Sequence, residues 1–303
     1  MFDETLENIK TKERVDFLEK LKKDAESYDI SLFHGSNSAS LIGVTRAKGL
    51  LPAGQMVSED SNAVPFSGEL DKGIEENGVN REAISFTKDF PHVAIEYSGL
   101  HEYKRAQRGY RAKNEFSNFG FNINGWNLAK GQLELEKLNQ QLRGSKYDDP
   151  DFVRYRASIE TRITLEKKRL AIWPTLSLKE QNFIEDPFSI LYGINFANFQ
   201  KISNKLHKIP QGSASEYYVQ GKVDESVMTI LCPGEKMDVV KKYLLDNGIK
   251  MPVLSLEILD FLITEFTYWI GKNSGKSMWS NFGSLHDYIS ALIKWRDTEL
   301  AST

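Results

Sequence analysis

The chain has 303 residues, of which 40% are hydrophobic and 27% are charged, and these proportions exclude disorder over most of its length. Its 39 basic and 42 acidic side chains leave a net charge of −3, so no global field favours nucleic acid or a membrane. The single cysteine, Cys232, excludes an internal disulfide framework and a metal site built from several cysteines. We find neither a signal peptide nor an apolar run of about 18 residues, which predicts a soluble protein of a reducing compartment.

Helical and β-like segments are mixed in the first third of the chain. Apolar residues at three- and four-residue steps predict an amphipathic helix over 2–28. A short strand is expected over 30–33, and it ends at the sequence His34-Gly35-Ser36. A helix and a turn are expected over 37–55, and the polar residues 56–80 predict a long surface loop.

The next third begins with a strand and continues into helices. Residues 82–87 predict a second strand, which a helix through 91–97 follows. Residues 101–113 are polar and basic. From 127 to 171 the apolar residues recur at helical spacing on both sides of a turn, which predicts a helical hairpin inserted into, or laid against, a β core.

Strands return in the last third, before a helical end. One strand is expected over 188–193, and a pair of strands over 216–219 and 227–231, separated by a turn at Gly221. Helices are expected over 236–247, 255–270 and 284–299. Because strands and helices do not alternate regularly, the sequence predicts an α+β fold.

Three segments occur in a defined order along these strands. The first is Phe33-His34-Gly35-Ser36 at a strand end, followed by the turn Gly49-Leu-Leu-Pro52. The second is the strand Ala83-Ile-Ser-Phe-Thr87, which leads into a helix that carries Ala94 and Tyr97. The third is Ser215-Glu216-Tyr-Tyr-Val219, before the hydrophobic run that ends at Leu231.

These segments together resemble the ADP-ribosyltransferase superfamily, and within it the poly(ADP-ribose)-polymerase-like branch and bacterial toxins that modify nucleic acids. The resemblance covers about 31–100 and 186–232. It implies a split antiparallel β core, to which this chain adds an N-terminal helix, a helical hairpin insert and C-terminal helices. The implied organisation is an N-terminal helix at 1–30, a catalytic domain at 31–235 with a helical insert at 127–180, and a helical region at 236–303 packed on the core.

The resemblance implies that NAD is the substrate that the site binds. Five residues are assigned to that binding: His34 to a ribose, Gly35 to the nicotinamide carboxamide, Ser36 to the adenosine side, Ser85 as a brace in its strand, and Tyr97 stacked on nicotinamide. A glycine beside the histidine suits this role, because without a Cβ the backbone can approach a flat amide closely.

Glu216 is implied to be the catalytic residue, bound to a hydroxyl of the nicotinamide ribose. Cleavage of the bond between nicotinamide and ribose generates an oxocarbenium-like centre, as in glycoside hydrolysis. A carboxylate beside that centre stabilises the transition state more than the ground state. This chemistry requires no metal and no second cofactor.

Departures from the family pattern restrict the expected activity. The polymerase branch has tyrosine where this chain has Ser85, so transfer of a single ADP-ribose is expected instead of polymer elongation. The toxins that modify arginine carry Glu or Gln two residues before the catalytic glutamate, and here that position is Ala214. Arginine modification is therefore disfavoured.

A basic stretch interleaved with Tyr103 and Tyr110 favours a nucleic acid as the target over a protein. Its substrate-binding candidates are Lys104, Arg105, Arg108 and Arg111, which can hold phosphates while the tyrosine rings stack on bases. The other interpretation of this stretch is a solvated loop or helix face.

The leading hypothesis is thus an NAD-dependent mono-ADP-ribosyltransferase that acts as a bacterial toxin or effector. It would work in the cytoplasm, or in the cytoplasm of a target cell after delivery, and an antitoxin or immunity protein is a possible partner. Two rival hypotheses remain: a catalytically inactive module that binds NAD or ADP-ribose on the same fold, and an RNA 2′-phosphotransferase, which also uses NAD.

Overall fold

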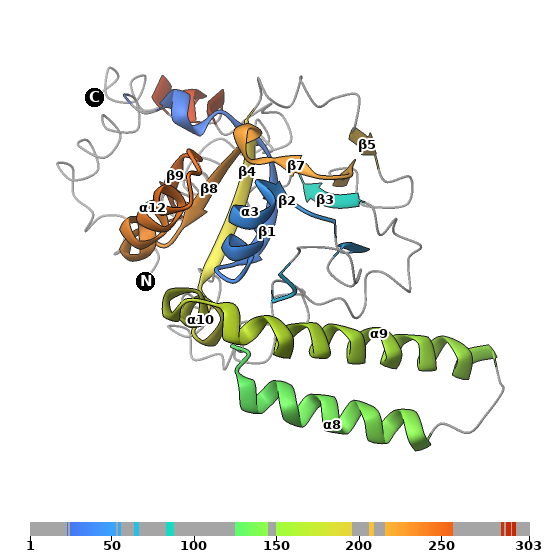
Figure 1. Cartoon of the computed structure of the whole chain (residues 1–303). Coiled ribbons are helices and arrows are strands. Elements are labelled where there is room, and N and C mark those ends of the chain that lie inside the picture. The colour runs from blue at the N-terminus through green and yellow to red at the C-terminus, as the bar shows by residue number, and fades with distance from the viewer. Residues whose placement is uncertain are drawn as a thin grey trace, which may run out of the picture.

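The computed structural model describes residues 23, 25–52, 54–55, 64–66, 83–87, 125–144, 150–195, 206–208, 216–256, 286–287, 289–291 and 293–294. Within these residues the fold is α+β, as the sequence predicts, and it is organised around a mixed sheet (Figure 1). The described strands of that sheet have the order β5-β6-β3-β1-β4-β8-β9.

The strands of the sheet are β1 (Ile30–Asn37), β3 (Ala83–Thr87), β4 (Ser189–Asn195), β5 (Leu206–Lys208), β6 (Glu216–Gln220), β8 (Met228–Cys232) and β9 (Val253–Ser255). Two short strands, β2 (Gly49–Leu50) and β7 (Val223–Asp224), pair separately. The helices are α3 (Ser40–Ala47), α8 (Leu128–Gly144), α9 (Pro150–Ile172), α10 (Leu178–Glu185) and α12 (Met237–Asp246). Short 3₁₀ turns occur at Ala25–Tyr28, Trp173–Thr175, Glu225–Val227 and Gly234–Lys236.

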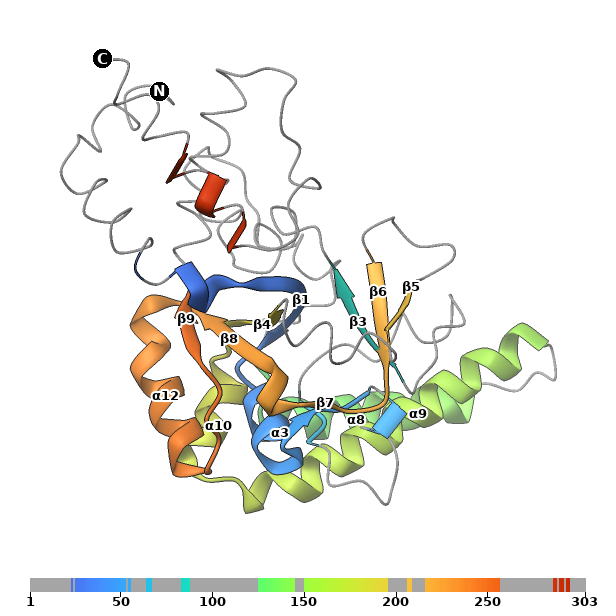
Figure 2. The same cartoon turned by 90° about the horizontal axis from the view of Figure 1, so that it is seen from above.

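The strand pairing is uneven across the sheet. β1 pairs with β4 from Ile30 to Asn37, whereas β1 and β3 share one register pair, Phe33 with Thr87. On the other side of that junction, β3 pairs with β6 over the whole of both strands. The sheet therefore consists of two well-paired parts, β5-β6-β3 and β1-β4-β8-β9, which meet at a single row of residues (Figure 2).

Two expectations about the strands are corrected by this topology. The segments 216–219 and 227–231 are both strands, but β6 pairs with β3 and β5, whereas β8 pairs with β4 and β9. The short β7 and the 3₁₀ turn after it separate β6 from β8, so the two strands do not form a hairpin. The core is also not antiparallel throughout, because β9 lies parallel to β8.

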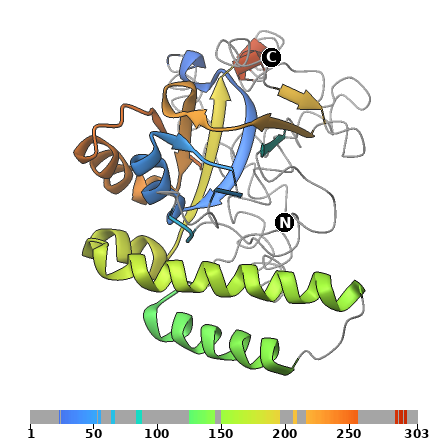
Figure 3. The ribbon, with the colours of Figure 1, turned by 45° about the vertical axis from the view of Figure 1, so that its right-hand side comes forward.

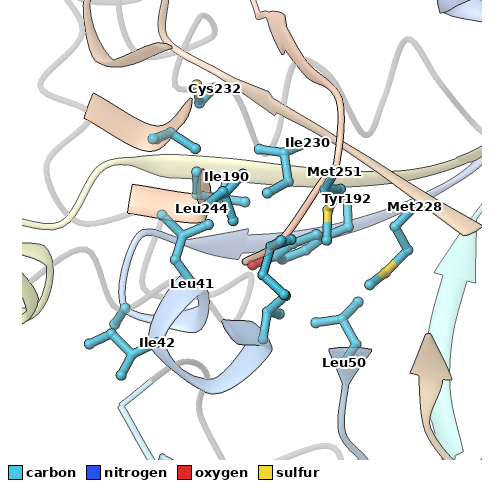
Figure 4. Packing of buried hydrophobic residues seen from close by; sticks show 14 of the residues in the cluster. Leu41, Ile42, Leu50, Ile190, Tyr192, Met228, Ile230, Cys232, Leu244 and Met251 are labelled. Atoms are coloured by element: carbon cyan, nitrogen blue, oxygen red, sulfur yellow. The ribbon is translucent and has the colours of Figure 1, made fainter. Parts of the chain in front are cut away.

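The strands β4 and β8 are buried on both faces, which explains why most of their residues are apolar. Alternate residues of β4, Ile190, Tyr192 and Ile194, belong to the main hydrophobic core together with side chains of α3 and α12. Leu191, between them, is also fully buried but lies outside that cluster. Figure 4 shows Tyr192 among the buried side chains of this core, together with Leu41 of α3 and Ile230 of β8.

The helical hairpin that the sequence predicts is present as α8 and α9, which lie side by side and extend beyond the edge of the sheet (Figure 3). It has a small core of its own, made by Leu138, Ile159 and Ile163 with Leu135 and Leu142 packed against them. Among the described residues, the hairpin contacts the body of the protein mainly at its base, because this core is separate from the main one.

The terminal segments are described only in part. The helix expected over 2–28 lies largely outside the described residues, and its described end forms the 3₁₀ turn Ala25–Tyr28. Helix α12 confirms the helix expected over 236–247. Ser255, the first residue of the helix expected over 255–270, is instead the last residue of β9, and beyond Leu256 that segment lies outside the described residues. Of the segment 284–299, the described residues are helical.

Because of Tyr192, the stability of the fold is expected to depend on pH in the alkaline range. Its hydroxyl lies 2.7 Å from Ser40 Oγ, and burial raises the pKa of Tyr192 above the ordinary value. The folded pKa is the higher one, so the contribution is complete below about pH 10 and is lost above it, where only the unfolded chain ionises. We expect the free energy of unfolding to fall by about 1.4 kcal/mol per pH unit through this residue.

Urea unfolding between about pH 9 and pH 11 measures that slope. Tyr192→Phe should remove this part of the slope, whereas Tyr155→Phe should retain it, because Tyr155 is 51% exposed on α9. Equal slopes for the two variants would contradict the assignment.

Candidate functional site

The three sequence segments that resemble the ADP-ribosyltransferases lie on three neighbouring strands. β1 carries His34-Gly35-Ser36, β3 carries Ser85, and β6 begins at Glu216. These strands are adjacent in the order β6-β3-β1, although about 180 residues of the chain separate the first segment from the last. Pairing between distant segments has therefore brought them together.

The register aligns the segments closely as well. Phe33 pairs with Thr87, and Thr87 pairs with Glu216, so Phe33, Thr87 and Glu216 form one row across the three strands. Two strand spacings separate the ends of this row, or about 10 Å between backbones. The backbones of β1 and β6 are therefore close to each other along this row. The same row is the junction at which the two parts of the sheet meet.

His34 is half-buried and packs between two aromatic rings. Its ring centroid lies 5.5 Å from that of Phe86 on β3 and 6.4 Å from that of Tyr192 on β4. Phe86 is 1% exposed and Tyr192 is fully buried, so one side of the imidazole faces the hydrophobic core. These contacts fix the orientation of the ring while part of the side chain stays accessible.

The segment His34-Gly35-Ser36 lies within β1 and not at its end, which corrects the expected boundary. Pairing with β4 continues through Gly35 opposite Leu191 and Ser36 opposite Ile190, because β4 is long enough to accompany β1 to Asn37. Gly35 is half-buried, whereas Ser36 is only 9% exposed. Little of the Ser36 side chain is thus available to a ligand.

Glu216 and Ser85 are described through their backbones. Glu216 is the first residue of β6, as the sequence predicts, and Ser85 pairs with Tyr218 in the middle of β3. Tyr97 and the basic residues Lys104, Arg105, Arg108 and Arg111 lie outside the described residues. Their assigned roles remain predictions.

The turn that follows the first segment is tied to the strand that carries Glu216. Gly49 pairs with Asp224 and Leu50 with Val223, directly after the end of β6. Gly49 has φ +153°, and a Cβ on it would lie 2.2 Å from the carbonyl oxygen of Val223. A side chain does not fit there, so the Gly-Leu-Leu-Pro turn depends on its glycine to reach β7.

Two acidic residues beside this turn differ in their environments. The backbone N–H and the hydroxyl of Ser226 lower the pKa of the Asp224 carboxyl, which is exposed. Glu225 is half-buried, and its Oε2 is enclosed without a hydrogen-bond partner in the part of the chain that the structure describes. Glu225 is therefore not an ordinary surface carboxylate, although the sequence places it in a polar turn.

A polar cluster lies at the base of the helical hairpin, and the sequence does not predict it. Glu166 and Arg169 form an ion pair on α9, and Trp126 donates a hydrogen bond from Nε1 to Glu166 Oε2 at 2.9 Å. The spacing of the pair by three residues on a helix is visible in the sequence. Its burial is not visible there, because it depends on what packs over α9.

Among the described residues, no group of three or more His, Cys, Asp or Glu side chains has a geometry that could hold a metal ion. In the same part of the chain, no helix is both long enough and apolar enough to cross a membrane. The chain matches no family model, no curated protein and no solved structure.

Proposed function

We propose that this protein is a mono-ADP-ribosyltransferase that cleaves the bond between nicotinamide and ribose in NAD and transfers ADP-ribose to a macromolecule. The observation that carries the proposal is the row Phe33–Thr87–Glu216 across β1, β3 and β6. This row gathers the three segments that together resemble the family. A chance resemblance of three short sequences gives no reason for them to occupy adjacent strands.

The proposed reaction uses few protein groups. Nicotinamide leaves with the electron pair of its bond to ribose, and positive charge develops on the ribose C1′ and ring oxygen. The Glu216 carboxylate binds the ribose hydroxyl and opposes that charge. A nucleophilic oxygen or nitrogen of the target then bonds to C1′ and releases its proton. His34 and the backbone of Gly35 hold NAD in place.

The proposed target is a nucleic acid, on the basis of the basic and aromatic residues 103–111. Incubation of a cell extract with the protein and NAD labelled in the adenylate distinguishes the two classes of target. Label that nuclease releases and protease does not would support a nucleic acid. Label that only protease releases would move the target to protein and leave the transferase proposal intact.

The role of His34 predicts a loss of NAD binding in His34→Ala. A ligand whose concentration is 100 times its dissociation constant stabilises the native state by about 2.7 kcal/mol. A tenfold loss of affinity lowers that gain by about 1.4 kcal/mol, and thermal-shift titration with NAD measures it.

The matched control for His34→Ala is Ile159→Ala, which removes a buried apolar side chain from the separate core of the helical hairpin and no group assigned to NAD. This variant should melt at a lower temperature and still gain the full NAD shift. If His34→Ala gains as much from NAD as the wild type does, His34 is not part of the binding site.

A further inference from the structure

The connection between β2 and β3, residues 51–82, carries three described residues near its middle, Val64–Phe66. All three are buried, with Val64 3% and Phe66 7% exposed. The carbonyl oxygen of Val64 lies 4.0 Å from the position that a Cβ on Gly43 of α3 would occupy. One side of this short turn therefore rests on the helix that follows the His34 segment.

The other side of the turn packs on the base of the helical hairpin. The ring centroid of Phe66 lies 5.0 Å from Trp126 and 6.2 Å from Trp173, and the two tryptophans lie 5.0 Å apart. Trp126 precedes α8 and Trp173 follows α9. The two ends of the hairpin thus meet around one side chain of the connection.

A buried ion pair adds a polar contact at the same place. Arg169 pairs with Glu166 through one guanidinium nitrogen, while its Nε donates a hydrogen bond to the carbonyl oxygen of Pro65 at 2.5 Å. Trp126 Nε1 donates a hydrogen bond to the other carboxylate oxygen of Glu166, Oε2. The side chains of Arg169 and Glu166 are 16% and 5% exposed. We call Trp126, Glu166, Arg169 and Trp173 the hairpin clamp.

Both ends of the connection are attached to the candidate site. Its start follows β2, which pairs with β7 next to β6, and its end is β3, which pairs with β6. We propose that the hairpin clamp positions the β2–β3 connection by holding Pro65 and Phe66, and so sets the position of β3, the strand of the candidate site into which the connection leads. Phe66 and Arg169 are then positioning residues. The part of this inference that concerns NAD rests on the proposed function.

The physical basis is the conformational entropy of the connection. A chain segment held at both ends and near its middle has fewer conformations than one held at its ends alone. Release of the middle lowers the fraction of molecules in the competent conformation, and the apparent affinity for a ligand falls in proportion. The rate of the bound complex stays close to its original value, because no reacting group is removed.

The test compares Phe66→Ala with Leu138→Ala. Both remove a buried apolar side chain, but Leu138 belongs to the separate core of the hairpin and makes no part of the clamp. Hydrogen exchange is followed in peptides that contain Val64–Phe66 and in peptides from α8 and α9, and NAD hydrolysis gives KM and kcat. Arg169→Lys is a second variant, since lysine keeps the charge near Glu166 but lacks the guanidinium fork.

For Phe66→Ala we expect about tenfold faster exchange around residue 65, a KM for NAD about tenfold higher, and a kcat within about threefold of the wild type. Arg169→Lys should change the same quantities in the same direction. Leu138→Ala should accelerate exchange in α8 and α9 and leave KM unchanged. Phe66→Leu, which restores most of the apolar volume, should recover most of the wild-type KM.

Two results would overturn the proposal. Unchanged exchange around residue 65 in both Phe66→Ala and Arg169→Lys would show that the clamp does not hold the connection. Faster exchange with an unchanged KM would show that the connection does not affect NAD binding. If the wild-type protein neither binds nor hydrolyses NAD, the proposed function is wrong and the NAD part of this inference falls with it, while the exchange data still decide whether the clamp holds the connection.

Discussion

Glu216→Gln should lower the kcat for NAD cleavage by about 100- to 1,000-fold, the cost of removing one well-placed electrostatic group. Glutamine keeps the size of the side chain and most of its hydrogen-bonding capacity, but it lacks the charge that opposes the developing cation. The KM for NAD should change much less, because that interaction strengthens only as the bond to nicotinamide breaks. Steady-state release of nicotinamide measures both constants.

The control for Glu216→Gln must be a glutamate whose neutralisation leaves the fold undisturbed. Glu225 does not qualify, since one of its carboxylate oxygens is enclosed by the protein. Glu235 is exposed in the 3₁₀ turn after β8, so Glu235→Gln should match the wild type. If Glu216→Gln turns over NAD within about threefold of the wild type, the transferase proposal fails, and a protein that still binds NAD becomes a binding module.

Arg169→Met should lower the free energy of unfolding by about 3–5 kcal/mol, because it leaves the buried carboxylate of Glu166 without its cation. Trp126 can still donate to Glu166, but one hydrogen bond does not replace the lost charge. Urea denaturation measures the change in the transition midpoint at a constant slope. The double variant Glu166→Gln/Arg169→Met should regain most of the loss, since neither charge then remains buried.

Arg162→Met is the matched control on the same helix. Arg162 pairs with Glu134 at 2.7 Å, but both side chains are more than one third exposed. Solvent screens such a pair, so this substitution should cost less than about 1 kcal/mol. Equal losses for Arg169→Met and Arg162→Met would mean that burial of the Glu166–Arg169 pair has no energetic consequence.

Local patterns in the sequence are sufficient for most of the individual elements. The apolar runs in β1, β4 and β8 indicate strands because few other structures bury consecutive residues on two faces. Leu138 and Ile159 recur with their neighbours at helical spacing, and they form the seam between α8 and α9. These features depend on residues close together in the chain, which is why a single sequence can reveal them.

The pairing of the strands could not be predicted from the sequence and is seen only in the tertiary structure. The sequence places strands at β6 and β8 in succession, yet each pairs with distant strands instead of with the other. β1 ends four residues beyond the strand expected over 30–33, because its length depends on β4, more than 150 residues away. Neither result follows from local preference, since both depend on which distant segment completes the hydrogen bonding of the backbone.

The candidate site likewise has features that are visible in the sequence and features that depend on the fold. A histidine beside a glycine and a glutamate at the start of a strand can be recognised in the sequence, because their chemistry is a local property. The shared row of Phe33, Thr87 and Glu216, and the contacts of Pro65 and Phe66 with the base of the hairpin, appear only in the folded molecule. Those contacts join segments far apart in the chain, and they form because burial of apolar surface and pairing of buried polar groups act on the folded molecule as a whole.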